Sequence, residues 1–140
     1  MRFIEIDESL FAQLWQLHSA YKEAIQEDAP TEQDKQRLLA AIKRGDIRFY
    51  GCLDDGERLV GCCSISYTFS TFNYQKSGVF EDFYIVPEYR HQGIAKKLVA
   101  FAVEKSGVKS LTVGCADCDA DMYRALGFTV PLGNMLAFDP

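Results

Sequence analysis

Residues 79–103 read Val-Phe-Glu-Asp-Phe-Tyr-Ile-Val-Pro-Glu-Tyr-Arg-His-Gln-Gly-Ile-Ala-Lys-Lys-Leu-Val-Ala-Phe-Ala-Val, and this stretch decides the fold. Its first part, residues 79–86, is rich in β-branched and aromatic residues and stops at Pro87, which predicts a strand. From Ile94 the apolar residues recur at helical spacing, and Gly107 offers a C-terminal stop. The stretch therefore predicts a strand that feeds a helix through a short loop.

The loop between strand and helix, residues 90–95, has the properties of an anion site. Backbone N–H groups at the start of a helix have no partner within the helix, and the helix dipole places partial positive charge there. Gly93 lets the main chain approach a ligand closely, and Arg90, Lys96 and Lys97 add positive charge. We therefore expect this loop to bind a phosphate group.

The pattern Arg90-x-x-Gly93-x-Ala95 resembles the Arg/Gln-x-x-Gly-x-Gly/Ala signature of the GNAT superfamily of acetyl-CoA-dependent N-acetyltransferases. The resemblance implies acetyl-CoA as acetyl donor, with its pyrophosphate on the loop and its pantetheine arm along the preceding strand. An ordinary strand–turn–helix with basic surface residues is the alternative. The implied cofactor-binding residues are Tyr84, Ile85, Val86, Arg90, His91, Gln92, Gly93, Ile94, Ala95, Lys96 and Lys97.

Two carboxylates, Glu81 and Asp82, stand side by side in this otherwise apolar strand, where burial is costly unless they are paired or used. Strand alternation is expected to send one to each face. The run 80–86 is similar to that of polyamine-type acetyltransferases in the superfamily, whose glutamate contacts the amine. By that resemblance Glu81 is expected to be the amine-binding group or base, and Asp82 is the second candidate for this role. The alternative is an ion pair with Arg90, Lys97 or another basic side chain.

Tyr123 lies in a Tyr-x-x-x-Gly-Phe element over residues 123–128, which matches a family element whose tyrosine lies near the cofactor sulfur. A phenol with a pKa of about 10 is protonated at neutral pH and can donate to a departing thiolate. Tyr123 is therefore expected as the general acid, and a packing residue of an amphipathic helix is the alternative. Where the family carries an asparagine before this tyrosine, the sequence has Ala116, with Asp117 as the candidate replacement.

Composition restricts the partners. The chain has 140 residues, 48% hydrophobic and 25% charged, as expected for one soluble domain with a buried core. Its net charge of −5 argues against nucleic acid as the main partner. No apolar run approaches the roughly 20 residues of a membrane helix, and the N-terminus does not resemble a signal peptide. A cytoplasmic protein without a membrane partner is expected.

The five cysteines do not form a metal-binding pattern. Cys62 and Cys63 are neighbours in a predicted strand and point to opposite faces, so they cannot hold one ion together. Cys115 and Cys118 form a C-x-x-C pair without a second pair. We therefore expect no metal site and reduced thiols.

The remaining sequence predicts elements in an order typical of the GNAT fold. Strands are expected over residues 2–6, 47–53, 58–69, 79–86, 110–115 and 134–138, and helices over 9–26, 31–45, 94–106 and 120–126. The predicted fold class is α/β, a mixed central sheet of six or seven strands with about four flanking helices. Residues 1–140 are expected to form a single N-acetyltransferase domain.

The resemblance implies transfer of the acetyl group of acetyl-CoA to a primary amine by direct attack, with a small cationic amine as the leading substrate class. No cysteine lies in a setting that activates a nucleophile, so no acetyl-enzyme intermediate is expected. Acetylation of a protein N-terminus or lysine and a non-catalytic acyl-CoA-binding module are the alternatives. A homodimer is compatible with the resemblance, because dimers are common in the family.

Overall fold

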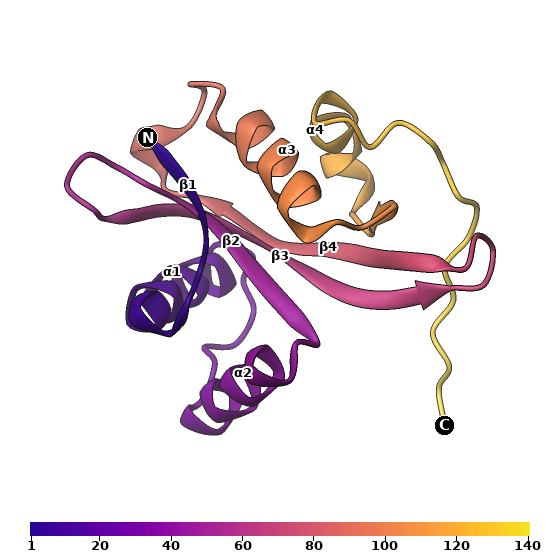
Figure 1. Cartoon of the computed structure of the whole chain (residues 1–140), viewed down its shortest axis with the longest axis horizontal. Helices are drawn as coiled ribbons and strands as arrows, with labels where there is room; N and C mark the ends of the chain where they lie inside the picture. Colours follow the sequence, from indigo (N-terminus) through magenta and orange to yellow (C-terminus); the bar gives the residue numbers. More distant parts are fainter.

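The computed structural model describes all 140 residues, which form one mixed sheet covered by helices on both faces (Figure 1). The sheet has five strands in the order β1-β2-β3-β4-β5. Neighbours from β1 to β4 are antiparallel, and β5 runs parallel to β4. The strands are β1 (Arg2–Glu5), β2 (Ile47–Leu53), β3 (Leu59–Ser70), β4 (Gln75–Ile85) and β5 (Ser110–Val113), and the helices are α1 (Phe11–Ala24), α2 (Glu32–Arg44), α3 (Ile94–Ser106) and α4 (Ala120–Ala125).

The helix ends follow local signals in the sequence. At the start of α2, the Thr31 side chain and the Asp34 side chain each bond the other residue's backbone N–H, which forms a capping box. Gly45 ends this helix in the left-handed conformation at φ 80°. Helix α3 starts after Gly93 and ends before Gly107, at φ 78° and 70°. These boundaries confirm the predicted limits of both helices.

The sheet separates two layers of side chains. Helices α1 and α2 cover one face, and α3 and α4 cover the other (Figure 1). Alternation along β3 supplies both layers, since Cys62 packs on the α1 side and Ile65 on the α3 side. The α1 layer also contains buried Leu14, Leu17 and Phe49, and the α3 layer contains buried Tyr50, Phe80 and Leu98.

Two predictions about strands are wrong. The strand predicted over residues 79–86 begins too late, because residues 75–78 also pair with β3 and belong to the longer β4. The final edge strand predicted over residues 134–138 does not form, so the sheet has five strands and not six or seven. Residues 129–140 contain Pro131 and left-handed Gly133 and form no helix or strand (Figure 1). Strand β5 is therefore an edge of the sheet.

The longest helix, α1, has 14 residues, and none of the helices combines the length and apolar character needed to span a membrane.

Candidate active site

Strand β4 contains a β-bulge at Asp82. Ser64 pairs with Glu81 and Cys62 pairs with Tyr84, so two residues of β4 lie opposite one residue of β3. Asp82 takes up the extra length with a φ of 53°, in the left-handed region that a non-glycine residue rarely adopts. The bulge changes the direction of the side chains that follow Glu81.

The bulge brings both carboxylates to the face of the sheet that α1 covers. One Asp82 oxygen accepts a hydrogen bond from Oγ of Ser64 at 2.6 Å, and the other lies 3.9 Å from Nδ1 of His18 on α1. Glu81 pairs with Ser64, and directly paired residues of two strands share a face. The expectation that alternation sends one carboxylate to each face is therefore wrong.

The carboxylate pair has no strong cation beside it. Asp82 has a side chain only 15% exposed, and His18 is the only basic group within ion-pairing distance of it. Partial burial and the negative charge of Asp82 both raise the pKa of Glu81. The ion pair with Arg90 does not form, because that guanidinium donates to the carbonyl of Ile85 at 2.7 Å. Lys22 lies close enough to lower the pKa of Glu81 in part, but it pairs with Glu27 at 3.0 Å, so neither carboxylate forms an ion pair with a lysine or arginine.

Tyr21 of α1 lies at the same site. Its ring faces the ring of Tyr84 with centroids 6.4 Å apart. Burial raises the pKa of Tyr21 to about 12. The negative charges of Asp82, Glu27 and Glu81 add to this rise. Tyr21 therefore lies within electrostatic reach of both carboxylates of β4.

Tyr123 of α4 packs on the aromatic layer below the helix. Its ring meets Phe80 at 6.4 Å and Phe128 at 5.9 Å between centroids. Burial raises the pKa of Tyr123, and the charge of Asp119 adds to the rise, so the phenol stays protonated at neutral pH. It is both a packing residue and an available proton donor. Asp117 lies in an exposed turn before this helix.

The edge of β4 next to β5 is open where the pantetheine arm is expected. Pairing between the two strands runs from Ser77 with Ser110 to Phe80 with Val113, where β5 ends. Strand β4 continues to Ile85, so residues 81–85 have no strand partner on that side. The carbonyls of Ile85 and Asp82 accept from Arg90 and Cys62, and the remaining peptide groups on that side can bind an amide-containing chain by β-augmentation. This edge fits the pantetheine arm of acetyl-CoA.

The start of α3 has free backbone donors. No residue between 91 and 96 donates a backbone hydrogen bond to the surrounding loops, and Gly93 provides no side-chain cap. A Cβ on Gly93 would meet nothing within 4 Å, so the surface in front of the helix is open. Arg90, Lys96 and Lys97 are exposed around it. The residues present therefore fit a pyrophosphate group.

Three residues of this site were missed in the sequence. Tyr21 and His18 approach the carboxylates because α1 packs on β3 and β4, whereas Ser64 does so through the pairing of β3 with β4. The one local signal was a histidine inside the apolar stripe of α1, next to Leu14, Leu17 and Tyr21. Such a histidine is buried without an obvious polar partner, which is unusual.

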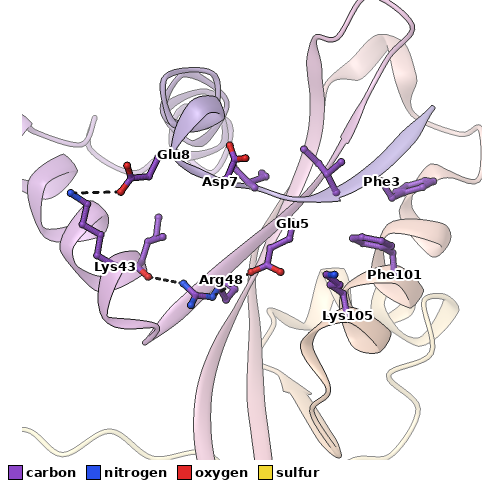
Figure 2. A pocket seen from close by; sticks show the side chains of 11 residues that line it. Phe3, Glu5, Asp7, Glu8, Lys43, Arg48, Phe101 and Lys105 are labelled. Atoms are coloured by element: carbon purple, nitrogen blue, oxygen red, sulfur yellow. Dashed lines mark hydrogen bonds and ion pairs between the residues drawn. The ribbon is translucent and has the colours of Figure 1, made fainter.

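A separate cavity lies away from this site. It has a volume of about 840 Å³ and is bordered by β1, α2 and α3 (Figure 2). Its acidic groups are already engaged, since Glu8 pairs with Lys43 at 3.7 Å and Glu5 pairs with Arg48 at 3.4 Å. No group of three His, Cys, Asp or Glu side chains is arranged to hold a metal ion. The acidic pair beside α1 therefore remains the candidate active site.

Comparison with known proteins gives the family. A curated relative, thialysine N-epsilon-acetyltransferase of Bos taurus, is 28% identical over 145 residues, which cover 91% of this chain and 85% of the relative. A solved probable acetyltransferase has a TM-score of 0.86 at 21% identity, covering 100% of this chain and 99% of that one. A predicted acetyltransferase from Clostridium acetobutylicum, crystallised with acetyl-CoA, has a TM-score of 0.76 at 13% identity, covering 99% and 95%.

The likeness to the solved structures extends over the whole fold, and the family match covers the part of the chain from β2 to α4, which includes β4, the loop before α3 and Tyr123. Residues 45–130 match the family described as the acetyltransferase (GNAT) domain. Members of this family use acetyl-CoA, in agreement with the open edge of β4 and the free donors at the start of α3. The chain therefore belongs to the GNAT acetyltransferases.

Proposed function

We propose that the protein transfers the acetyl group of acetyl-CoA to the primary amine of a small cationic substrate. The observation that carries this proposal is the largely buried carboxylate of Asp82, which has no lysine or arginine beside it and lies next to a second carboxylate, Glu81. A negative site without a counter-charge favours a cation, because the cation relieves the repulsion between the two carboxylates. The ammonium group of an amine acceptor is such a cation.

Acetyl-CoA is the acetyl donor in this proposal. The backbone N–H groups of residues 91–96 bind its pyrophosphate, with Arg90, Lys96 and Lys97 around them. The open edge formed by Tyr84, Ile85 and the following Val86 binds the pantetheine arm through peptide groups. The thioester then lies beside the bulge, where a backbone N–H near Tyr84 faces the developing oxyanion.

The reaction proceeds by direct attack. The ammonium gives one proton to Glu81 or Asp82, and the freed lone pair attacks the thioester carbonyl. The new C–N bond forms, the C–S bond breaks, and the nitrogen gives its second proton to water. Tyr123 gives its proton to the thiolate, whose acid form has a pKa of about 8.5. The resemblance of residues 80–86 to polyamine-type acetyltransferases favours Glu81 as the amine-binding group or base.

The relatives suggest a substrate class. The bovine relative is named for the ε-amine of thialysine, a small amino acid, and its coverage of 91% of this chain supports a small amine here. Solved neighbours named as aminoglycoside, glucosamine-6-phosphate and ribosomal-protein-alanine acetyltransferases are 15% identical or less and share the fold alone. A protein N-terminus or lysine remains the second candidate acceptor.

A homodimer and a cytoplasmic location complete the proposal. Residues 129–140 expose five large apolar side chains, namely Val130, Leu132, Met135, Leu136 and Phe138. An apolar segment of this kind is typical of a surface that a partner covers. Sedimentation of the full chain, compared with a chain ending at Phe128, measures whether residues 129–140 join two copies.

The cytoplasmic location rests on the cysteines. The five free cysteines suit a reducing compartment.

The test of function is release of free CoA from acetyl-CoA with a panel of amino acids, polyamines, aminoglycosides and short peptides. Wild type is compared with Glu81→Gln and with Glu104→Gln, a matched change of an exposed carboxylate on α3. Turnover with one small amine, lost only in Glu81→Gln, supports the proposal. Turnover with peptides alone supports the second acceptor class, and tight acetyl-CoA binding without turnover supports a non-catalytic module.

A further inference from the structure

One buried polar atom on α1 has no partner. His18 is only 9% exposed, and its Nδ1 atom makes no hydrogen bond. The rings of Trp15, Tyr21 and Phe49 surround it at 5.7, 6.1 and 6.3 Å between centroids. Burying an unsatisfied polar atom destabilises the folded state, and a phenylalanine of similar shape avoids that cost. Packing alone therefore does not explain a histidine at this position.

The free atom of His18 faces a free atom of Asp82. Oδ2 of Asp82 is occupied by the hydroxyl of Ser64 at 2.6 Å, whereas Oδ1 accepts no hydrogen bond. Nδ1 lies 3.9 Å from Oδ1, somewhat beyond hydrogen-bond distance. A rotation of either side chain that shortens this gap by about 1 Å makes a normal hydrogen bond. Ser64 fixes the carboxylate so that Oδ1 remains on the side of His18.

We propose that His18 is a positioning residue of the acceptor site, which acts through Asp82 by taking up the proton that the substrate ammonium gives to this carboxylate. This inference rests on the proposed function and deepens it. The N–H bond of the ammonium breaks, its electron pair becomes the attacking lone pair, and the proton goes to Oδ1. It then passes to Nδ1, which restores the carboxylate and leaves an imidazolium. The imidazolium returns the proton to solvent after the products leave.

The charges around His18 keep the imidazole ready to accept a proton. Burial lowers the pKa of His18, and the positive charge of Lys22 on α1 lowers it further. Asp82 on β4 and Glu27 beyond α1 act in the opposite direction but do not cancel the effect of burial. Tyr21 and, on β3, Cys62 also face this region, and burial raises the pKa of both, so they stay neutral. The resting state is therefore a neutral histidine beside the carboxyl group of Asp82.

This arrangement assigns separate tasks to the two carboxylates. Asp82 has a route for the proton through His18, whereas no basic side chain lies within ion-pairing distance of Glu81. Glu81 is then the anchor that holds the ammonium, and Asp82 is the group that deprotonates it. The resemblance to polyamine-type enzymes favours Glu81 as the amine-binding group or base, with Asp82 as the second candidate.

The test measures kcat and kcat/KM between pH 5 and 9 for wild type, His18→Phe and His18→Asn, with the acceptor found in the CoA-release panel. We expect His18→Phe to lower kcat at least tenfold and to remove the acid limb that His18 protonation causes. It should leave the Kd for acetyl-CoA within twofold and the protein at least as resistant to urea as wild type. His18→Asn places a polar atom near the Nδ1 position but has no titrating group. Its KM for the amine should therefore match that of wild type, whereas its pH profile should lack the acid limb.

The outcomes separate this inference from the proposed function. Gln16→Ala on the exposed side of α1 is the control for effects of changing this helix, and it should behave as wild type. A wild type that turns over, with His18→Phe showing kcat within twofold and the same pH profile, overturns the role of His18 and leaves the proposed function standing. A wild type that binds acetyl-CoA and turns over no acceptor overturns both.

Discussion

Phe80 pairs with Val113 across β4 and β5, and no later residue of β4 has a partner on β5. The bulge at Asp82 begins two residues beyond this last pair. The edge proposed to bind the pantetheine arm and the bulge that carries Asp82 therefore lie in the same few residues of one strand. In the proposed reaction, the acetyl donor and the amine acceptor meet at this point of the sheet.

Replacement of Tyr123 by phenylalanine should lower kcat about 100-fold or more, since general acid catalysis contributes roughly 10²–10⁴-fold. The phenylalanine ring keeps the contacts with Phe80 and Phe128, so the Kd for acetyl-CoA and the urea midpoint should not change. Steady-state kinetics and calorimetry measure these quantities. Tyr74→Phe at the exposed β3–β4 turn is the control. Equal kcat in both variants would remove Tyr123 from the reaction.

Replacement of Asp82 by asparagine should lower the pKa of Glu81. The negative charge of Asp82 contributes to the raised pKa of Glu81, so its removal makes deprotonation easier. Carboxyl chemical shifts followed by NMR against pH measure the change directly. The same variant should raise KM for the amine about tenfold or more, because half of the acidic pair is lost. A Glu81 titration that does not move would show that the two carboxylates do not share one site.

Replacement of Gly93 by alanine should weaken acetyl-CoA binding at least tenfold. Its φ of 78° is strained for alanine by about 1–2 kcal/mol, so the start of α3 must shift and its N–H groups move. Gly107→Ala at the other end of the same helix is a matched control, since its φ is 70° and a Cβ there also meets nothing within 4 Å. Both variants should lose similar stability towards urea. If both weaken acetyl-CoA equally, the loop is not the phosphate site.

The stability advantage of His18→Phe over wild type should grow as the pH falls. The folded-state pKa of His18 lies below the ordinary 6.5, so the unfolded state takes up a proton first. Wild type therefore loses stability from about pH 6.5 downwards until the folded-state pKa is passed, whereas the phenylalanine variant has no such loss. Urea unfolding at pH 7.5, 6 and 5 measures the difference. A constant difference would mean that burial does not lower the His18 pKa.

Local signals in the sequence predicted the helices and the loop of this protein well. The left-handed glycines, the capping box of α2 and the change from strand to helix near Gly93 each depend on a few adjacent residues. The predicted number of strands is wrong because the apolar side chains of residues 129–140 suggested a final strand, and this segment pairs with no other strand. Apolar content alone does not determine whether a segment joins a sheet.

The candidate site was only partly predictable, for a different reason. The roles expected of Glu81 and Tyr123 come from the resemblance. The face of the sheet on which the Asp82 side chain lies depends instead on the register between β3 and β4. The role inferred for His18 depends on how α1 packs against that bulge. Such relationships join residues far apart in the chain, and no short pattern records them.

The left-handed backbone of Asp82 also has a consequence for engineering. Glycine adopts this conformation without strain, and Asp82→Gly also removes a poorly compensated charge, so the substitution should make the chain more heat-resistant. It would at the same time delete the group proposed to receive the substrate proton. Directed evolution that selects on melting temperature alone should therefore enrich robust but inactive variants at position 82, and libraries for this enzyme need selection on turnover in every round.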